Sequence, residues 1–87
     1  EEEMIDKKIS DTEYIFSSRL EVDYLNEKYD LGLPESEEYE TLSGLLLSYK
    51  ENIPQKDEKI FIDDNIFTVL HSSKTKVEKV QLIKKAE

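Results

Sequence analysis

The stretch of residues 25–54 constrains the fold most, because it holds both glycines, both prolines and the most continuous apolar run of the 87-residue chain. Thr41 predicts an N-cap within it, since its hydroxyl can accept a hydrogen bond from a free amide of a first helical turn. Asn52 and Pro54 predict the end of that helix, because proline cannot continue the hydrogen-bond ladder. Four apolar residues between these signals follow the i, i+3, i+4, i+7 spacing of one helix face: Leu42, Leu45, Leu46 and Tyr49.

Gly44 lies inside this predicted helix, where glycine weakens a helix by about 1 kcal/mol relative to alanine. One interpretation is that Gly44 allows closer approach of whatever packs across that face. The other is an ordinary core helix that tolerates a glycine. The spacing alone leaves both open.

Charge is distributed unevenly along the chain. Residues 1–40 hold fourteen acidic and four basic side chains, whereas residues 41–87 hold seven acidic and eight basic ones, which together give the net charge of −9. Nucleic acid and anionic membranes are poor partners for such a chain, because both attract basic surfaces. Cations or a basic protein face would be attracted.

Size and composition predict one small domain, since a second core would need roughly 50 more residues. No run of 18 apolar residues predicts a membrane span. The chain has no cysteine, so it can form no disulfide and no thiolate site. It does not begin with Met, and we expect it to be a piece of a longer protein.

The first half of the chain reads as a tail followed by a strand and a helix. Residues 1–11 are mostly charged and predict a linker or tail. Residues 12–18 (TEYIFSS) are rich in β-formers and predict a strand, and residues 21–29 predict a short helix with Glu21 and Asp23 in its first turn. Residues 30–40 form the connector to the second helix, where Gly32 suits the left-handed conformation that often closes a helix.

The pattern becomes alternating after Pro54. Strands are predicted at residues 59–63, 65–72 and 77–83, with turns at residues 63–65 and 73–75, and residues 84–87 as a frayed end. We expect Phe67, Val69 and His71 to share one face of the sheet. Val77 and Val80 are three residues apart, which breaks the period of two and predicts either a β-bulge or a late start of the strand. The predicted fold is therefore α+β, with two helices packed on one side of a mixed or antiparallel sheet, in the order β-α-α-β-β-β.

Few residues could carry chemistry. His71 is the only histidine and lacks a partner for a triad or a two-histidine metal site, so we interpret it as a partly exposed sheet residue. No glycine-rich phosphate loop and no spaced pair of catalytic carboxylates is present. The sequence therefore names no catalytic, cofactor-binding or metal-ligating residue, predicts no cofactor, and favours a protein that is not an enzyme.

Two acidic places could attract divalent cations: the connector carboxylates Glu35, Glu37, Glu38 and Glu40, and the turn at Asp63 and Asp64. Neither follows the alternating ligand pattern with a central glycine that EF-hand loops need. We interpret the connector as a solvated acidic loop, since carboxylates are normally exposed. Any divalent ion bound at either place is expected to bind weakly.

Several motifs together carry a family resemblance. They are Leu25-Asn26-Glu27, the Leu33-Pro34-Glu35 turn, Tyr39-Glu40-Thr41-Leu42-Ser43-Gly44, and Ile53-Pro54 before a three-strand meander. In this combination the chain resembles the transporter-associated domain, the CorC/HlyC C-terminal domain of hemolysin-like and magnesium/cobalt efflux proteins. The likeness covers residues 14–83, within a domain that we place at residues 12–83. Asp57 and Lys76 depart from the family pattern, both at turns.

The resemblance implies a context. Such domains form the C-terminal part, on the cytoplasmic side of a membrane, of chains that begin with a membrane domain and continue with a CBS-domain pair. The implied role is a non-enzymatic regulatory or interaction module that modulates cation transport, with the rest of the parent chain as partner. The implied fold is similar to part of FAD-binding oxidoreductase domains.

That last similarity supplies the alternative function, a flavin- or nucleotide-binding domain. It is disfavoured by the lack of a phosphate-binding glycine loop and by the acidic first half of the chain. Weakly bound divalent cations and further copies of the chain are left open as partners. The sequence leaves open the ion and the direction of transport.

Overall fold

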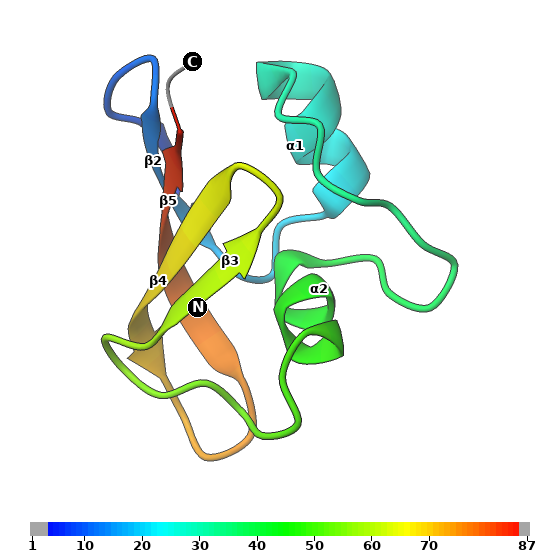
Figure 1. Ribbon diagram of the computed structural model, residues 1–87, viewed down its shortest axis with the longest axis vertical. Helices are drawn as coiled ribbons and strands as arrows, with labels where there is room; N and C mark the ends of the chain where they lie inside the picture. Colours follow the sequence, from blue (N-terminus) through cyan, green and yellow to red (C-terminus); the bar gives the residue numbers. More distant parts are fainter. Residues whose placement is uncertain (1–3, 86–87) are drawn as a thin grey trace.

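Five strands form one antiparallel sheet within the described residues, and the two helices pack on one of its faces (Figure 1). The computed structural model describes residues 4–85. The elements are β1 (Asp6–Lys8), β2 (Glu13–Ser17), α1 (Val22–Tyr29), α2 (Leu42–Ser48), β3 (Lys59–Ile62), β4 (Asn65–Ser72) and β5 (Val77–Lys84). The order of strands in the sheet is β1-β2-β5-β4-β3, and every pairing between neighbours is antiparallel. The predicted α+β class and the order β-α-α-β-β-β are confirmed, with one more strand ahead of them.

That extra strand corrects the assignment of residues 1–11 to a linker or tail. Residues 6–8 form β1 and pair with β2, with Asp6 opposite Phe16 and Lys8 opposite Tyr14. The strand is short and charged, as edge strands commonly are, so its sequence shows no apolar alternation. Residues 1–3 of the predicted tail lie outside the described residues.

The predicted frayed end needs a similar correction. Lys84 is the last residue of β5, and the backbone N–H of Lys85 donates a hydrogen bond to the carbonyl of Asp64, at 2.8 Å. Residues 86–87 of that end lie outside the described residues. The turn between β3 and β4 therefore also holds the residue that follows β5.

The core lies between the sheet and the helices. Alternate residues of β2, β3, β4 and β5 point toward α1 and α2, because successive side chains of a strand point to opposite faces. The fully buried side chains of the core are Phe16, Phe67, Leu25, Leu42, Leu45, Leu46, Ile62, Leu82, Val22, Val69, Val77 and Val80. The sheet face that points away from the helices has no such cover within the described residues (Figure 1).

Helix α2 begins as predicted but ends early. The Thr41 hydroxyl accepts a hydrogen bond from the backbone N–H of Gly44 at 3.3 Å, which confirms the N-cap. The helix stops at Ser48, and Tyr49 is its C-cap with 49% of its surface exposed. The expectation that Tyr49 shares the buried face is therefore wrong, because the helix ends before reaching it.

Helix α1 is closed by an aspartate rather than by the glycine expected from the sequence. Asp30 is the C-cap, with a left-handed φ of 56°, and its N–H donates to the carbonyl of Asn26. Gly32 also has a positive φ, of 70°, and lies two residues further on. Two left-handed residues in close succession turn the chain away from the helix and into the connector.

Strands β4 and β5 slip past each other near His71. Val69 pairs with Val80, His71 with Lys79, and Ser72 with Val77, so each strand carries one extra residue between these pairs. The predicted bulge between Val77 and Val80 is confirmed, and a second irregularity lies on β4. This second shift breaks the alternation, so His71 is exposed while Val69 is buried. The predicted exposure of His71 is confirmed, but its placement on the face of Phe67 and Val69 is wrong.

Candidate functional site

An acidic hollow of about 180 Å³ lies between the start of α1 and the connector. A short antiparallel bridge between Glu21 and Thr41 brings the two segments together. In this bridge Val22 N–H donates to the carbonyl of Glu40 at 2.9 Å, and Leu42 N–H donates to the carbonyl of Leu20 at 3.0 Å. The residues that line the hollow are Glu21, Val22, Asp23, Glu35, Ser36, Tyr39 and Glu40.

Asn26 fixes the connector that forms the outer wall of this hollow. Its side-chain amide accepts a hydrogen bond from Leu33 N–H and donates one to the Leu33 carbonyl, both at 2.8 Å. The same Nδ2 donates to the carboxylate of Glu35 at 2.8 Å. Tyr39 closes the loop by donating its hydroxyl to the carbonyl of Pro34 at 2.7 Å. The connector is thus held by side-chain hydrogen bonds to its own backbone.

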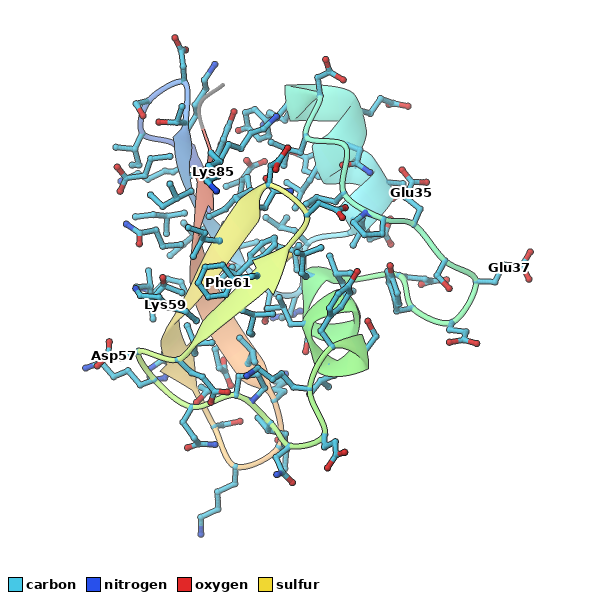
Figure 2. All side chains as sticks on the ribbon, viewed as in Figure 1. Glu35, Glu37, Asp57, Lys59, Phe61 and Lys85 are labelled. Atoms are coloured by element: carbon cyan, nitrogen blue, oxygen red, sulfur yellow. The ribbon has the colours of Figure 1, made fainter. Side chains whose placement is uncertain are left out.

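The sequence identified only part of this set. Of the four connector carboxylates, Glu35 and Glu40 line the hollow, whereas Glu37 extends from the outer tip of the connector (Figure 2). Glu21 and Asp23 come from the other wall, and the sequence had assigned them only to the first turn of a helix. Asn26 was part of a family motif with no assigned role. The sequence signal for its role was a side-chain amide on a helix that ends a few residues before a Leu-Pro turn.

The hollow is electronegative, and its tyrosine reflects this. Burial raises the pKa of Tyr39, and the nearby Tyr49, Glu35 and Glu38 raise it further. Within residues 4–85, however, no three acidic, histidine or cysteine side chains converge closely enough to hold a metal ion. The hollow can attract a cation or a basic side chain, but it is not a preformed metal centre.

The other acidic place, at Asp63 and Asp64, has a different environment. Asp63 has a positive φ of 54°, which confirms the tight turn between β3 and β4. A hollow of about 270 Å³ at this turn is lined by Leu31, Gly32, Asp63, Asp64, Asn65, Lys84 and Lys85. The two lysines oppose a cation there, so this turn is a weaker candidate than the connector.

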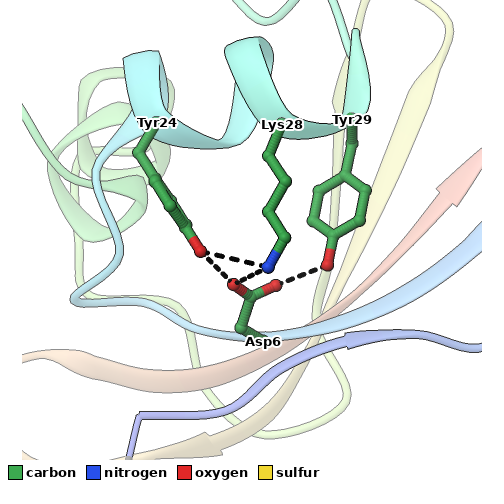
Figure 3. A network of polar contacts seen from close by, with 4 residues as sticks. All are labelled: Asp6, Tyr24, Lys28 and Tyr29. Atoms are coloured by element: carbon green, nitrogen blue, oxygen red, sulfur yellow. Dashed lines mark hydrogen bonds and ion pairs between the residues drawn. The ribbon is translucent and has the colours of Figure 1, made fainter.

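A polar network joins β1 to α1 (Figure 3). The carboxylate of Asp6 accepts hydrogen bonds from the Tyr24 hydroxyl, from Lys28 Nζ at 2.9 Å and from the Tyr29 hydroxyl at 2.7 Å. Lys28 Nζ also donates to the Tyr24 hydroxyl at 3.2 Å. The Tyr29 ring packs against Tyr14 of β2, with ring centroids 5.1 Å apart. Three side chains of one helix therefore hold a single carboxylate on the edge strand.

This network shifts the titration of its members. Burial acts to raise the pKa of Asp6, but the hydrogen bonds from Tyr24, Tyr29 and Lys28 outweigh it, so the pKa is lowered. The hydrogen bond to Asp6 raises the pKa of Lys28. Asp6 is therefore held in its charged form, a role that no pattern in the sequence indicated.

Comparison with known proteins decides the family. The family model described as "Transporter associated domain" (CorC_HlyC) matches residues 7–86. The chain belongs to this family. A curated relative, the UPF0053 protein YegH of Escherichia coli, is 30% identical over 77 residues. The match covers 88% of this chain but only 15% of that relative, so the domain corresponds to a small part of a much longer protein.

Solved structures of the family show the same fold. One is described as a Mg²⁺ and Co²⁺ transporter (CorC) associated region from Neisseria meningitidis, with a TM-score of 0.81, 20% identity and coverage of 91% of this chain and 96% of that one. Another is the transporter associated domain of a CBS domain protein from Porphyromonas gingivalis, with a TM-score of 0.76, 22% identity and coverage of 93% and 98%. A third, from a Xylella fastidiosa hemolysin, is in complex with Mg²⁺ and Mn²⁺, with a TM-score of 0.76, 21% identity and coverage of 94% and 99%. Neither helix of the transporter associated domain described here, α1 or α2, is long and apolar enough to cross a membrane.

Proposed function

We propose that this transporter associated domain is a non-enzymatic regulatory or interaction module of a longer membrane protein, and that it modulates cation transport of the magnesium/cobalt type. The observation that carries the proposal is the family match over residues 7–86, together with a curated relative of which the chain spans only 15%. The working protein is then the longer chain, and its membrane and CBS domains are the first partners of this module. The module lies on the cytoplasmic side of the membrane.

Two of the structural neighbours support this context. The Neisseria domain is described as a Mg²⁺ and Co²⁺ transporter associated region, and the Porphyromonas domain comes from a CBS domain protein. The geometry is consistent with a module that binds rather than catalyses, because its polar side chains brace its own loops. Asn26 holds the connector and Asp6 joins β1 to α1, so both side chains are already engaged in hydrogen bonds within the domain.

Divalent ions enter this proposal as weak ligands. The acidic hollow beside Glu35 and Glu40 offers negative charge without a converging set of ligands. Divalent cations need about six or more oxygen ligands, so water must supply most of them at such a site. We expect the hollow to concentrate cations or to meet a basic side chain of the longer protein, rather than to carry the transported ion.

The flavin or nucleotide alternative gains no comparable support. The hollow that the connector forms is lined by four carboxylates, Glu21, Asp23, Glu35 and Glu40, which would repel phosphate groups. We therefore expect purified protein to be colourless and to bind no flavin adenine dinucleotide in a titration.

The test compares the longer protein with a version that lacks this domain, both reconstituted in vesicles. Transport of Mg²⁺ and Co²⁺ is followed with an ion-sensitive dye inside the vesicles. We expect removal of the domain to change the rate or its dependence on ion concentration while transport itself persists. Identical transport by both proteins would contradict a regulatory role.

A further inference from the structure

The outer face of the sheet, which points away from α1 and α2, presents two rows of side chains across the strands. The strand register places Phe61, Ile66, Ile83 and Glu13 in one row and Lys59, Thr68, Gln81, Ile15 and Lys7 in the next. Phe61 is 65% exposed, and Ile15, Ile66 and Ile83 are half-buried. The outer face is thus apolar along its first row, from the edge strand β3 to the central strand β5.

The β1 end of the outer face is hollowed. This hollow of about 450 Å³ is lined by Met4, Ile5, Asp6, Lys7, Ile15 and Lys79. Met4 and Ile5 precede β1, so the chain enters the domain at this hollow. Met4 is 48% exposed, which adds a second exposed apolar side chain to the outer face.

The charges of the outer face contrast with those of the whole chain. Lys7 and Lys59 end one row, and Lys79 lies beside the hollow. Lys59 Nζ contacts only the neutral hydroxyl of Thr68, at 3.3 Å, among the described residues. The carboxylate of Glu13 is already bonded to the Gln81 amide at 2.8 Å. The two rows and the hollow therefore hold three ammonium groups and two carboxylates, those of Glu13 and Asp6, and both carboxylates are already hydrogen-bonded, on a chain whose net charge is −9.

The connector, with its four carboxylates, lies on the opposite side of the molecule. Glu35 and Glu37 lie on the connector, across the helices from Phe61 and Lys59 (Figure 2). A partner that bears carboxylates is repelled by the connector side and attracted to the outer face. The distribution of charge thus gives one preferred orientation of docking.

We propose that, within the longer protein, the outer face docks on the part of the chain that precedes this domain. The surface of that preceding part consists of apolar side chains surrounded by carboxylates. This inference rests on the proposed function, which makes the chain a part of a longer protein. The preceding segment reaches the domain at the hollow around Met4, which places its source next to the outer face. A tethered partner has an effective concentration of about 1 mM, so a small surface suffices.

A second copy fits the outer face less well. A two-fold contact brings the same patch of both copies together, so the lysines of one would oppose the lysines of the other. Like charges across an interface are unfavourable. The same face would accept anionic lipid by its charge, and the experiment separates that outcome from docking within the chain.

The test measures how fast a maleimide modifies a cysteine at position 61. The chain has no cysteine of its own, so Phe61→Cys reports on the outer face, and Glu37→Cys on the connector serves as control. Rates are read by peptide mass spectrometry in the 87-residue chain and in the longer protein. With a dissociation constant of about 0.1 mM for the tethered surface, we expect Phe61→Cys to react about tenfold more slowly in the longer protein. Glu37→Cys should react at similar rates in both.

A charge reversal identifies the carboxylate partner. Adding Lys59→Glu and Lys79→Glu to Phe61→Cys should return the ratio of its two rates to about one. The matched pair Lys56→Glu and Lys74→Glu makes the same charge change outside both the two rows and the hollow, and it should leave the slow rate in place. Restoration by both pairs would contradict a partner specific to the outer face.

Three further results would overturn the proposal. The first is an equal rate of Phe61→Cys modification in both proteins. The second is a modification rate in the 87-residue chain that falls as its concentration rises, and the third is a rate in that chain that falls on vesicles of phosphatidylcholine and phosphatidylglycerol. The second result would assign the face to a second copy and the third to lipid. Failure of the proposed function is a separate result. It would appear as equal transport by the longer protein and by the version that lacks this domain, whatever the rate at position 61.

Discussion

Gly44 lies against Tyr39 so closely that a Cβ atom on Gly44 would be 2.6 Å from the Cβ of Tyr39. The close approach that the glycine suggested is thus real, but its neighbour is the connector and not the sheet. Tyr39 cannot move freely, since its hydroxyl is bonded to the Pro34 carbonyl. Glycine at this position lets α2 press against the wall of the acidic hollow.

Gly44→Ala should therefore destabilise the chain, although alanine is the better helix former. We expect a loss of about 1–3 kcal/mol, the usual cost of overpacking, minus the gain in helix propensity of about 1 kcal/mol. Gly44→Leu should cost more. Urea unfolding followed by circular dichroism measures both, with Ser43→Ala on the same helix as control. A raised midpoint for Gly44→Ala would show that the connector yields without cost, because only the gain in helix propensity would then remain.

Asn26→Ala should loosen the connector. Removing the amide leaves the N–H and carbonyl of Leu33 without their partner, which costs about 1–3 kcal/mol for partly buried groups. Amide hydrogen exchange of Leu33 should accelerate along with the loss of stability. Glu27→Ala, one residue away and exposed, is the control and should change neither. Slow exchange at Leu33 in Asn26→Ala would mean that other contacts hold the connector.

Acid should weaken the attachment of β1. The pKa of Asp6 is lowered in the folded chain, so its contribution to stability is present above the unfolded pKa, near 3.8, and is lost as pH falls through the folded pKa. Asp6→Asn should thus lower the unfolding free energy at pH 7, and its deficit should shrink toward pH 3. Urea unfolding at both pH values tests this. Asp11→Asn, whose carboxylate is 99% exposed, should show little deficit at either pH.

Divalent cations should bind the isolated chain only weakly. The hollow holds Glu35 and Glu40 but no converging ligand set, so we expect dissociation constants on the order of millimolar for Mg²⁺ and Mn²⁺. Isothermal titration calorimetry measures this, with Glu35→Gln and Glu40→Gln combined as the variant. A stoichiometric site tighter than about 10 μM that this variant removes would make the domain an ion sensor in its own right.

The sequence by itself determined the parts of the fold that depend on neighbouring residues. Alternation and turn residues placed β3, β4 and the turn at Asp63, because period two and left-handed geometry are local properties of the chain. Thr41 marked the start of α2 for the same reason. The family motifs were recognisable because they occur at fixed spacing.

Only the tertiary structure decided which distant residues and elements contact one another. β1 carries no apolar pattern and exists because β2 offers it a free edge and because α1 offers Asp6 three hydrogen-bond donors. Glu21 and Glu35 line one hollow because the bridge between Glu21 and Thr41 brings the start of α1 against the connector. Such contacts link positions far apart in the chain, and their energies come from packing and electrostatics that no local pattern records.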